Sequence, residues 1–168
     1  MTPLPPPLGT GDLVLWRLDQ ARHAPTWGSG EGAYLFGGRW NSPGVRVVYA
    51  SLDPATAILE VAVHKTFQTL DITSHILTSA RLLDPARIHV VQPSDVPNPD
   101  WLRPGIPGAG QQTFGDQLVA DHGVVLIPSV VSSHSWNVIF SPAATAGRMA
   151  LLDQERFALD TRLNRPAP

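Results

Sequence analysis

The sequence has no cysteine among its 168 residues, so disulfides, thiolate metal sites and a cysteine nucleophile are all excluded. Charged residues make up 15% of the chain, whereas an average domain has about 25%. No run of 18 apolar residues occurs, so we expect no membrane-spanning segment. The N-terminal segment MTPLPPPLGTGDL has neither a basic region nor a long apolar region, and so does not resemble a signal peptide. We therefore expect a cytoplasmic protein.

The chain also has no excess of positive charge, because it contains 12 basic and 14 acidic residues. Proteins that bind nucleic acid by neutralising phosphates are usually basic, so we expect no direct nucleic-acid contact. Lysine is almost absent, because 11 of the 12 basic residues are arginine and only Lys65 is lysine. GC-rich codon usage explains such a bias, and so does recognition of anions by guanidinium groups. The six histidines show no ligand spacing, so no metal site is expected.

What the chain does have is 43% hydrophobic residues, which argues against disorder. Its length fits one domain with a substantial core. Glycine and proline, at 14 and 17 residues, concentrate in three stretches that we expect to be irregular. These are a lead-in over residues 1–11, a long segment over 19–44 and another over 93–111. We assign residues 12–168 to the single domain.

Short strand patterns outnumber helical ones along the chain. β-Branched and aromatic runs predict strands over 13–18, 46–51, 75–83, 87–92, 124–127, 136–140 and 156–163. One helix is predicted from Pro54 to about Lys65, with Asp53 as its N-cap. A second is predicted over 113–122, ending at Gly123. The interspersed order indicates an α+β domain with a mixed, mostly antiparallel sheet and few helices.

Two charged residues stand among apolar neighbours. Glu60 is the only charge in the segment ATAILEVAV. It is either a helix-rim glutamate paired with Lys or Arg, or a carboxylate in a partly apolar pocket where it stabilises a cation. Arg17 interrupts the apolar strand LVLWRL on the face of Leu13 and Leu15. It is either an edge-strand residue or a buried charge with a partner.

The cluster GGRWN over residues 37–41 suits contact with a ligand. Paired glycines let the backbone approach closely, Arg39 can grip a phosphate, Trp40 can stack and Asn41 can read amide or hydroxyl groups. The alternative is a surface turn of the hairpin type. Neither a dinucleotide fingerprint nor a phosphate-binding loop motif is present. A serine hydrolase built on Ser129 or its neighbours with His134 is disfavoured, since no GxSxG motif occurs.

The segments WRL, GGRWN, VVYAS, AILEV, IPSVV and WNVIFSP occur in this order between about Asp12 and Leu163. Together they resemble the RES domain family, which is named for an Arg, a Glu and a Ser that match Arg17, Glu60 and Ser129. The resemblance implies a fold similar to ADP-ribosyltransferases and diphtheria-type toxins. It also implies the toxin of a bacterial type II toxin–antitoxin pair. Its partner would be an Xre-like helix-turn-helix antitoxin, and the toxin would be a homodimer within a larger complex.

The family's activity is NAD⁺ degradation at the nicotinamide–ribose bond, by hydrolysis or phosphorolysis and without a metal. On this interpretation Glu60 stabilises the positively charged ribose, and Arg17 and Arg39 bind the pyrophosphate. Tyr49, by resemblance, and Trp40 would hold the nicotinamide ring. Ser129 and Asn137 would hydrogen-bond the ribose or the carboxamide, and Asn41 would also contact NAD⁺. Arg17, Tyr49 and Ser129 are counted as catalytic together with Glu60. The alternatives are a protein ADP-ribosyltransferase using the same pocket and a non-enzymatic interaction module.

Overall fold

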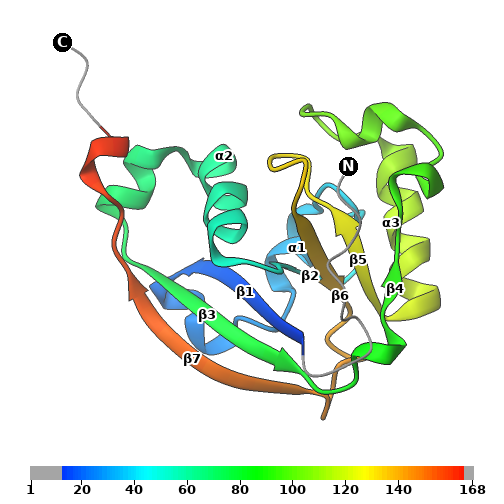
Figure 1. Ribbon diagram of the computed structural model, residues 1–168, viewed down its shortest axis with the longest axis horizontal. Coiled ribbons are helices and arrows are strands. Elements are labelled where there is room, and N and C mark those ends of the chain that lie inside the picture. The colour runs from blue at the N-terminus through cyan, green and yellow to red at the C-terminus, as the bar shows by residue number, and fades with distance from the viewer. Residues whose placement is uncertain (1–12, 165–168) are drawn as a thin grey trace.

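The computed structural model describes residues 13–164, so the predicted lead-in over residues 1–11 lies outside the described residues. Its centre is one seven-stranded sheet with the strand order β4-β5-β6-β2-β1-β3-β7 (Figure 1). All neighbouring strands pair antiparallel except β4 and β5, which are parallel. The strands are β1 (Leu13–Gln20), β2 (Val48–Ser51), β3 (His75–Leu82), β4 (His89–Val90), β5 (Val124–Pro128), β6 (Trp136–Phe140) and β7 (Met149–Phe157). The predicted α+β class with a mixed, mostly antiparallel sheet is confirmed.

The sheet divides into two halves at the junction of β1 and β2. These strands share a single registered pair, Trp16 with Ser51, whereas β1 and β3 are paired along their whole length. Figure 1 shows β1, β3 and β7 curving away from the remaining strands. We call β4, β5, β6 and β2 the four-stranded half, and β1, β3 and β7 the three-stranded half. The two halves therefore diverge from this junction.

The four-stranded half is buried on both faces. Along β5, Val124 and Leu126 belong to one apolar cluster, while Val125 and Ile127 belong to another. Successive residues of a strand point to opposite faces, so both faces carry core. Helix α3 (Ala109–His122) covers the second face and contributes Val119 to its cluster. Strands β5 and β6 are therefore a rigid base for any side chain at their ends.

Helix α2 (Pro54–Ile72) packs beside β1 and carries Glu60. Asp53 caps it as predicted, accepting a hydrogen bond from the Thr56 backbone N–H at 2.8 Å. The helix is broken at Thr66, which has a φ of 63° and a ψ of 154°. Its first segment thus ends at the predicted position, next to Lys65. Apolar residues of α2, β1 and β3 form a third cluster below it, among them Leu18, Ala62, Leu70 and Leu77.

The segment over residues 19–44 contains more regular structure than predicted. It completes β1 and continues into a 3₁₀ helix, η1 (Ala21–Thr26), and a short α-helix, α1 (Glu31–Phe36). The stretch over 93–111 likewise contains two 3₁₀ turns, η3 (Pro93–Asp95) and η4 (Pro99–Leu102). Helix α3 begins four residues before the predicted Thr113, after Gly108. Within this helix, Gly115 lets the backbone of Trp40 lie against it, because a Cβ there would lie 2.0 Å from the Trp40 carbonyl oxygen.

The predicted last strand is wrong in position. The strand observed is β7, Met149–Phe157, and a 3₁₀ turn, η5 (Thr161–Leu163), follows where the strand was expected to end. β7 is an edge strand whose side chains are mostly exposed, so the alternation that marks a half-buried strand is weak. The strand predicted over 87–92 shrinks to His89–Val90, preceded by a 3₁₀ turn, η2 (Pro85–Arg87). Within residues 13–164 no helix is long and apolar enough to cross a membrane.

Candidate active site

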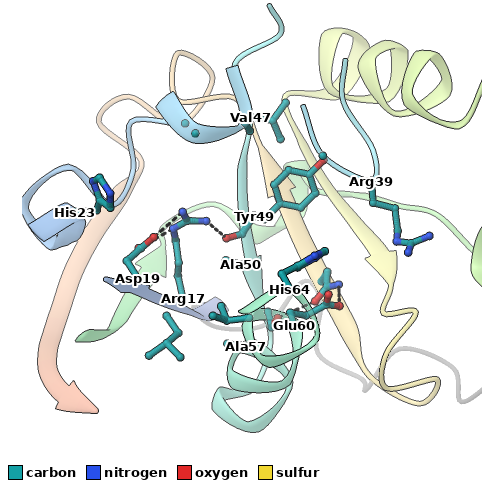
Figure 2. Close-up of a pocket in the computed structure, with 18 of the residues that line it drawn as sticks. Arg17, Asp19, His23, Arg39, Val47, Tyr49, Ala50, Ala57, Glu60 and His64 are labelled. Atoms are coloured by element: carbon teal, nitrogen blue, oxygen red, sulfur yellow. Dashed lines mark hydrogen bonds and ion pairs between the residues drawn. The ribbon is translucent and has the colours of Figure 1, made fainter. Parts of the chain in front are cut away.

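A cavity of about 530 Å³ lies where the two halves of the sheet diverge. Its floor comes from residues 16–20 of β1 and from Tyr49, Ala50 and Ser51 of β2. Helix α2 forms one wall with Glu60, and the GGRWN loop and α1 form another. Figure 2 shows Arg17, Tyr49 and Glu60 around this space, each from a different element. The volume suits a ligand the size of a drug molecule or a nucleotide.

Glu60 is held in the cavity by one of its two carboxylate oxygens. Oε1 accepts hydrogen bonds from the Ser129 hydroxyl, at 2.9 Å, and from the Asn137 side-chain amide. Among the described residues, Oε2 accepts no hydrogen bond and no cation forms an ion pair with the carboxylate. Within those residues, then, Glu60 is not the rim glutamate paired with Lys or Arg. It is a pocket carboxylate with neutral partners.

Ser129 and Asn137 face Glu60, although we expected them to contact ribose or carboxamide. Ser129 is 2% exposed, and its hydroxyl also accepts a hydrogen bond from the Ser132 backbone N–H at 3.1 Å. Asn137 does line the cavity, but its amide nitrogen donates to Glu60 and its oxygen accepts from Ser51 at 2.7 Å. The structure thus brings Ser129, Asn137 and Glu60 together as one hydrogen-bonded group.

Arg17 is a partnered charge within the sheet. Its strand has neighbours on both sides, so the edge-strand alternative is wrong. Nε and Nη2 donate to the two carboxylate oxygens of Asp19, at 2.8 and 2.7 Å, and Nη1 donates to the Tyr49 backbone carbonyl at 2.7 Å. The side chains of Arg17 and Asp19 are 27% and 10% exposed. The guanidinium therefore joins β1 to β2 where their backbone pairing has stopped, and Asp19 balances its charge.

The GGRWN loop forms a hairpin-type turn, since Gly38 and Asn41 make an antiparallel bridge, but Trp40 and Asn41 of this turn are buried rather than on the surface. Asn41 is fully buried, and its side-chain nitrogen donates to the backbone carbonyls of Ala33, Ser42 and Val45. Trp40 is 2% exposed and packs edge-on against Phe114, with ring centroids 6.3 Å apart. Asn41 thus holds the loop closed and has little capacity left for a ligand. Trp40 is mainly a core residue, although it also borders the cavity.

The paired glycines serve the protein's own packing. A Cβ at Gly38 would lie 2.6 Å from the Tyr49 hydroxyl, so only glycine leaves room for that side chain. Gly37 has a φ of 71°, a left-handed conformation that glycine adopts readily. The expected close approach of backbone to a ligand is here an approach of backbone to Tyr49.

Tyr49 presents its ring to the cavity while its hydroxyl is fully engaged. The hydroxyl donates to Asn41 Oδ1 at 2.7 Å and accepts from the Trp40 backbone N–H at 2.9 Å. Burial raises the pKa of Tyr49 far above its ordinary value, so the phenol stays neutral. Tyr49 therefore offers an aromatic face, and its hydroxyl is unsuited to proton transfer.

Arg39 is the predicted cation that remains most accessible at the cavity. Its guanidinium donates to the Gly105 backbone carbonyl at 2.8 Å. Partial burial lowers the pKa of Arg39, and the negative charge of Glu60 opposes that shift. A guanidinium keeps its proton under either influence. Figure 2 places Arg39 beyond Tyr49, on the side of the cavity away from Arg17.

Several lining residues were missed by the sequence interpretation: Asp19, His23, Ser51, His64 and Lys65. Some had a signal. His64 follows Glu60 by four residues and so shares its side of the helix, and Asp19 follows Arg17 by two and so shares its face of the strand. Ser51 had none, because its importance depends on the pairing of β2 with β6. Among residues 13–164, no group of three or more His, Asp or Glu side chains is placed to hold a metal ion.

Chemically, this arrangement suits a ligand that carries or develops positive charge beside Glu60. The donors that hold the Glu60 carboxylate are neutral, so they form no ion pair with it, and a partly apolar wall strengthens its field. The aromatic face of Tyr49 suits a flat cationic ring. Arg39 and Lys65 supply positive charge for an anionic part of the same molecule.

Comparisons with known proteins place the chain in a family. The family model described as the RES domain matches residues 14–160. The protein named Toxin Res from Pseudomonas putida is 30% identical over 155 residues, covering 90% of this chain and 99% of that protein. Toxin Res from Photorhabdus laumondii is 29% identical, with coverage of 90% and 97%.

Two further comparisons extend the picture. The Prs ADP-ribosylating toxin of a Sphingobium species is 30% identical over 127 residues, or 68% of this chain and 72% of that protein. Among solved structures, the crystal structure of the M. tuberculosis MbcT–MbcA toxin–antitoxin complex matches with a TM-score of 0.62. That match covers 88% of this chain and 85% of the other, at 18% identity, and shows a shared fold.

Proposed function

The chain belongs to the RES domain family, and on that premise we propose that it is a toxin that cleaves the nicotinamide–ribose bond of NAD⁺. One observation carries the proposal: Glu60 lies in the cavity with Oε1 tied to Ser129 and Asn137 and Oε2 left for a ligand. The relatives named Toxin Res, which this chain matches over 90% of its length, support the toxin part.

In the proposed reaction the bond between C1′ of the ribose and the nicotinamide nitrogen breaks. Its electron pair goes to the nitrogen, so nicotinamide leaves as a neutral molecule and positive charge develops on the ribose. Glu60 Oε2 stabilises that charge, as a carboxylate does in glycosidic cleavage. An oxygen of water or phosphate then bonds to C1′ and loses its proton to solvent. The products are nicotinamide and either ADP-ribose or its 1″-phosphate.

The remaining residues take the roles that their contacts allow. Tyr49 supplies the face for the nicotinamide ring, since its hydroxyl is already bonded on both sides. Arg39 and Lys65 hold the pyrophosphate. Arg17 contributes to binding of the pyrophosphate through its two N–H groups that donate to neither Asp19 nor Tyr49. Ser129 and Asn137 position Glu60.

The test is release of nicotinamide from NAD⁺ by the purified protein, followed by chromatography with and without phosphate. We expect Glu60→Gln to lower the rate at least about 100-fold, because the amide cannot stabilise the developing cation. The matched control is Glu31→Gln, which removes an exposed carboxylate paired with Arg46. A Glu60→Gln protein that consumed NAD⁺ at the native rate would contradict the proposal.

A second candidate, protein ADP-ribosylation, is favoured by one relative, the Prs ADP-ribosylating toxin. It uses the same bond cleavage, with a protein side chain in place of water or phosphate as the acceptor. Incubation with labelled NAD⁺ and a cell lysate separates the two. Free ADP-ribose supports NAD⁺ degradation, and a labelled protein band supports transfer.

We also propose an antitoxin partner of the Xre-like helix-turn-helix class, with the toxin as a homodimer in the complex. The likeness in fold to a chain of a solved toxin–antitoxin complex supports an antitoxin partner. Co-expression with the product of the neighbouring reading frame tests it. Co-purification and loss of NAD⁺ consumption are the expected results.

A further inference from the structure

We propose that Ser51 is a positioning residue that acts through Asn137 to fix the carboxylate of Glu60. The inference rests on the proposed function and adds to it a residue that neither touches the carboxylate nor belongs to the Arg, Glu and Ser that name the family. Ser51 ends β2 directly before the turn into α2.

The sheet register places Ser51 where it can act. Ser51 and Asn137 are registered partners in the antiparallel pairing of β2 with β6. Residues directly opposite each other in such a pair project from the same face of the sheet. The Ser51 hydroxyl donates to Asn137 Oδ1 at 2.7 Å, and both side chains are buried. The Asn137 amide nitrogen then reaches Glu60 on α2.

Ser51 contributes by anchoring the end of the Asn137 amide that points away from Glu60. The two ends of an Asn amide have opposite character, because the nitrogen donates hydrogen bonds and the oxygen only accepts them. If the amide turned over, its oxygen would face the Glu60 carboxylate and repel it. The Glu60 carboxylate, which only accepts, selects the orientation in which Nδ2 faces it, and the Ser51 hydroxyl then donates to Oδ1 at the other end of the amide. The buried hydroxyl thus holds the amide in this attractive arrangement.

That arrangement decides which oxygen of Glu60 faces a ligand. Asn137 and Ser129 both bond to Oε1, so Oε2 is the oxygen left for the ribose. With Ser51→Ala, Asn137 Oδ1 loses its donor inside the protein and the amide is no longer held. The carboxylate then keeps only Ser129 as a firm partner. We expect kcat for NAD⁺ cleavage to fall about tenfold. KM should stay within about twofold, since Ser51 is only 2% exposed and its hydroxyl donates its proton to Asn137.

The decisive experiment is a double-mutant cycle of Ser51→Ala, Asn137→Ala and the double variant. If Ser51 acts only through Asn137, the double variant has the same kcat as Asn137→Ala alone. Ser79→Ala is the matched control, because Ser79 is a buried strand serine of β3 outside the cavity lining, and its kcat should be native. Additive losses, or a native kcat for Ser51→Ala, would overturn the inference.

A readout that needs no activity separates this inference from the proposed function. The ¹⁵N resonance of the Asn137 side-chain amide, identified by its loss in Asn137→Ala, reports the bond to Glu60. Its protons should exchange with solvent slowly in the native protein and at least about tenfold faster in Ser51→Ala. Equal exchange in both overturns the positioning role. Altered exchange in a protein that leaves NAD⁺ intact supports the positioning role and refutes the reaction instead.

Discussion

Each half of the sheet holds a charged side chain at the cavity, Glu60 of α2 in one case and Arg17 of β1 in the other, but the two charges have different partners. On the four-stranded side, neutral donors at the ends of β5 and β6 hold one oxygen of Glu60 and leave its charge intact. On the three-stranded side, the carboxylate of Asp19 balances the charge of Arg17, and the Tyr49 backbone carbonyl accepts another hydrogen bond from the guanidinium. The four-stranded half thus holds Glu60 with its second oxygen toward the cavity, whereas Arg17 of the three-stranded half joins β1 to β2.

The difference explains why the cavity exists. Backbone pairing between β1 and β2 stops after Trp16 and Ser51, so the strands can separate and open a space. A separated junction inside a sheet would leave backbone groups without partners, which is costly when they are buried. Arg17 supplies a donor to the Tyr49 carbonyl across the gap. The same residue that borders the cavity thereby keeps the gap from collapsing or widening.

The largest expected effect on stability comes from breaking this junction with Arg17→Ala. The change removes the bond to β2 and leaves Asp19 nearly buried without a counter-charge. We expect a loss of about 2 kcal/mol in the free energy of unfolding, which lowers Tm by roughly 4–8 °C. KM for NAD⁺ should rise about tenfold, because the Tyr49 face shifts and the two unused N–H groups are lost. Thermal unfolding and steady-state kinetics measure the two parts.

Two further variants sharpen that result. In Arg17→Ala with Asp19→Asn, the uncompensated carboxylate is gone, so part of the lost stability should return. Arg22→Ala, in the 3₁₀ helix η1, removes an exposed arginine outside the cavity lining and should leave both Tm and KM unchanged. If Arg17→Ala unfolded at the native temperature, Arg17 would not join the two halves of the sheet.

A smaller effect is expected on the four-stranded side from Ser129→Ala. It removes one donor from Glu60 Oε1 and leaves Asn137 in place. We expect kcat to fall about tenfold with KM little changed, because Ser129 lies outside the cavity lining. Ser135→Ala is the control in the same turn, since its hydroxyl contacts Ser132 and not Glu60. A rise in KM with native kcat would instead place Ser129 in contact with the substrate.

The sequence predicted the local features of the fold well. The Asp53 cap, the end of the first α2 segment near Lys65 and the stop at Gly123 are set by interactions within a few residues. Glu60 also stood out locally, as a single charge in an apolar helix. These signals survive folding because tertiary contacts support them.

What the sequence left open depends on contacts between distant residues. Asn41 donates hydrogen bonds to backbone carbonyls that lie near it only once the loop has folded. From the sequence alone, this buried structural residue was predicted to contact a ligand. Ser51 gains a role only from its register with Asn137, 86 residues further along the chain. β7 was misplaced because an exposed edge strand carries little hydrophobic alternation.

The smallest expected effect lies at the outer edge of the four-stranded half, where His89 of β4 stacks on His122 of α3. Their rings are parallel within 3°, with centroids 3.7 Å apart. Burial, and then the charge of His122, lowers the pKa of His89 below its ordinary value near 6.5. The folded protein therefore binds fewer protons here than the unfolded chain, so stability is lost as the pH falls from about 6.5 through the folded pKa.

His122→Gln removes the second charge, so Tm should fall less between pH 7.5 and 5.5 than it does in the native protein. Each variant is compared with its own value at pH 7.5, which separates the charge effect from the lost ring contact. Neither histidine lines the cavity, so the pH dependence of NAD⁺ cleavage should be the same in both proteins. A changed activity profile would mean that the buried strands transmit a perturbation from β4 to Glu60. The four-stranded half would then be a responsive part of the site, where the structure shows a rigid base.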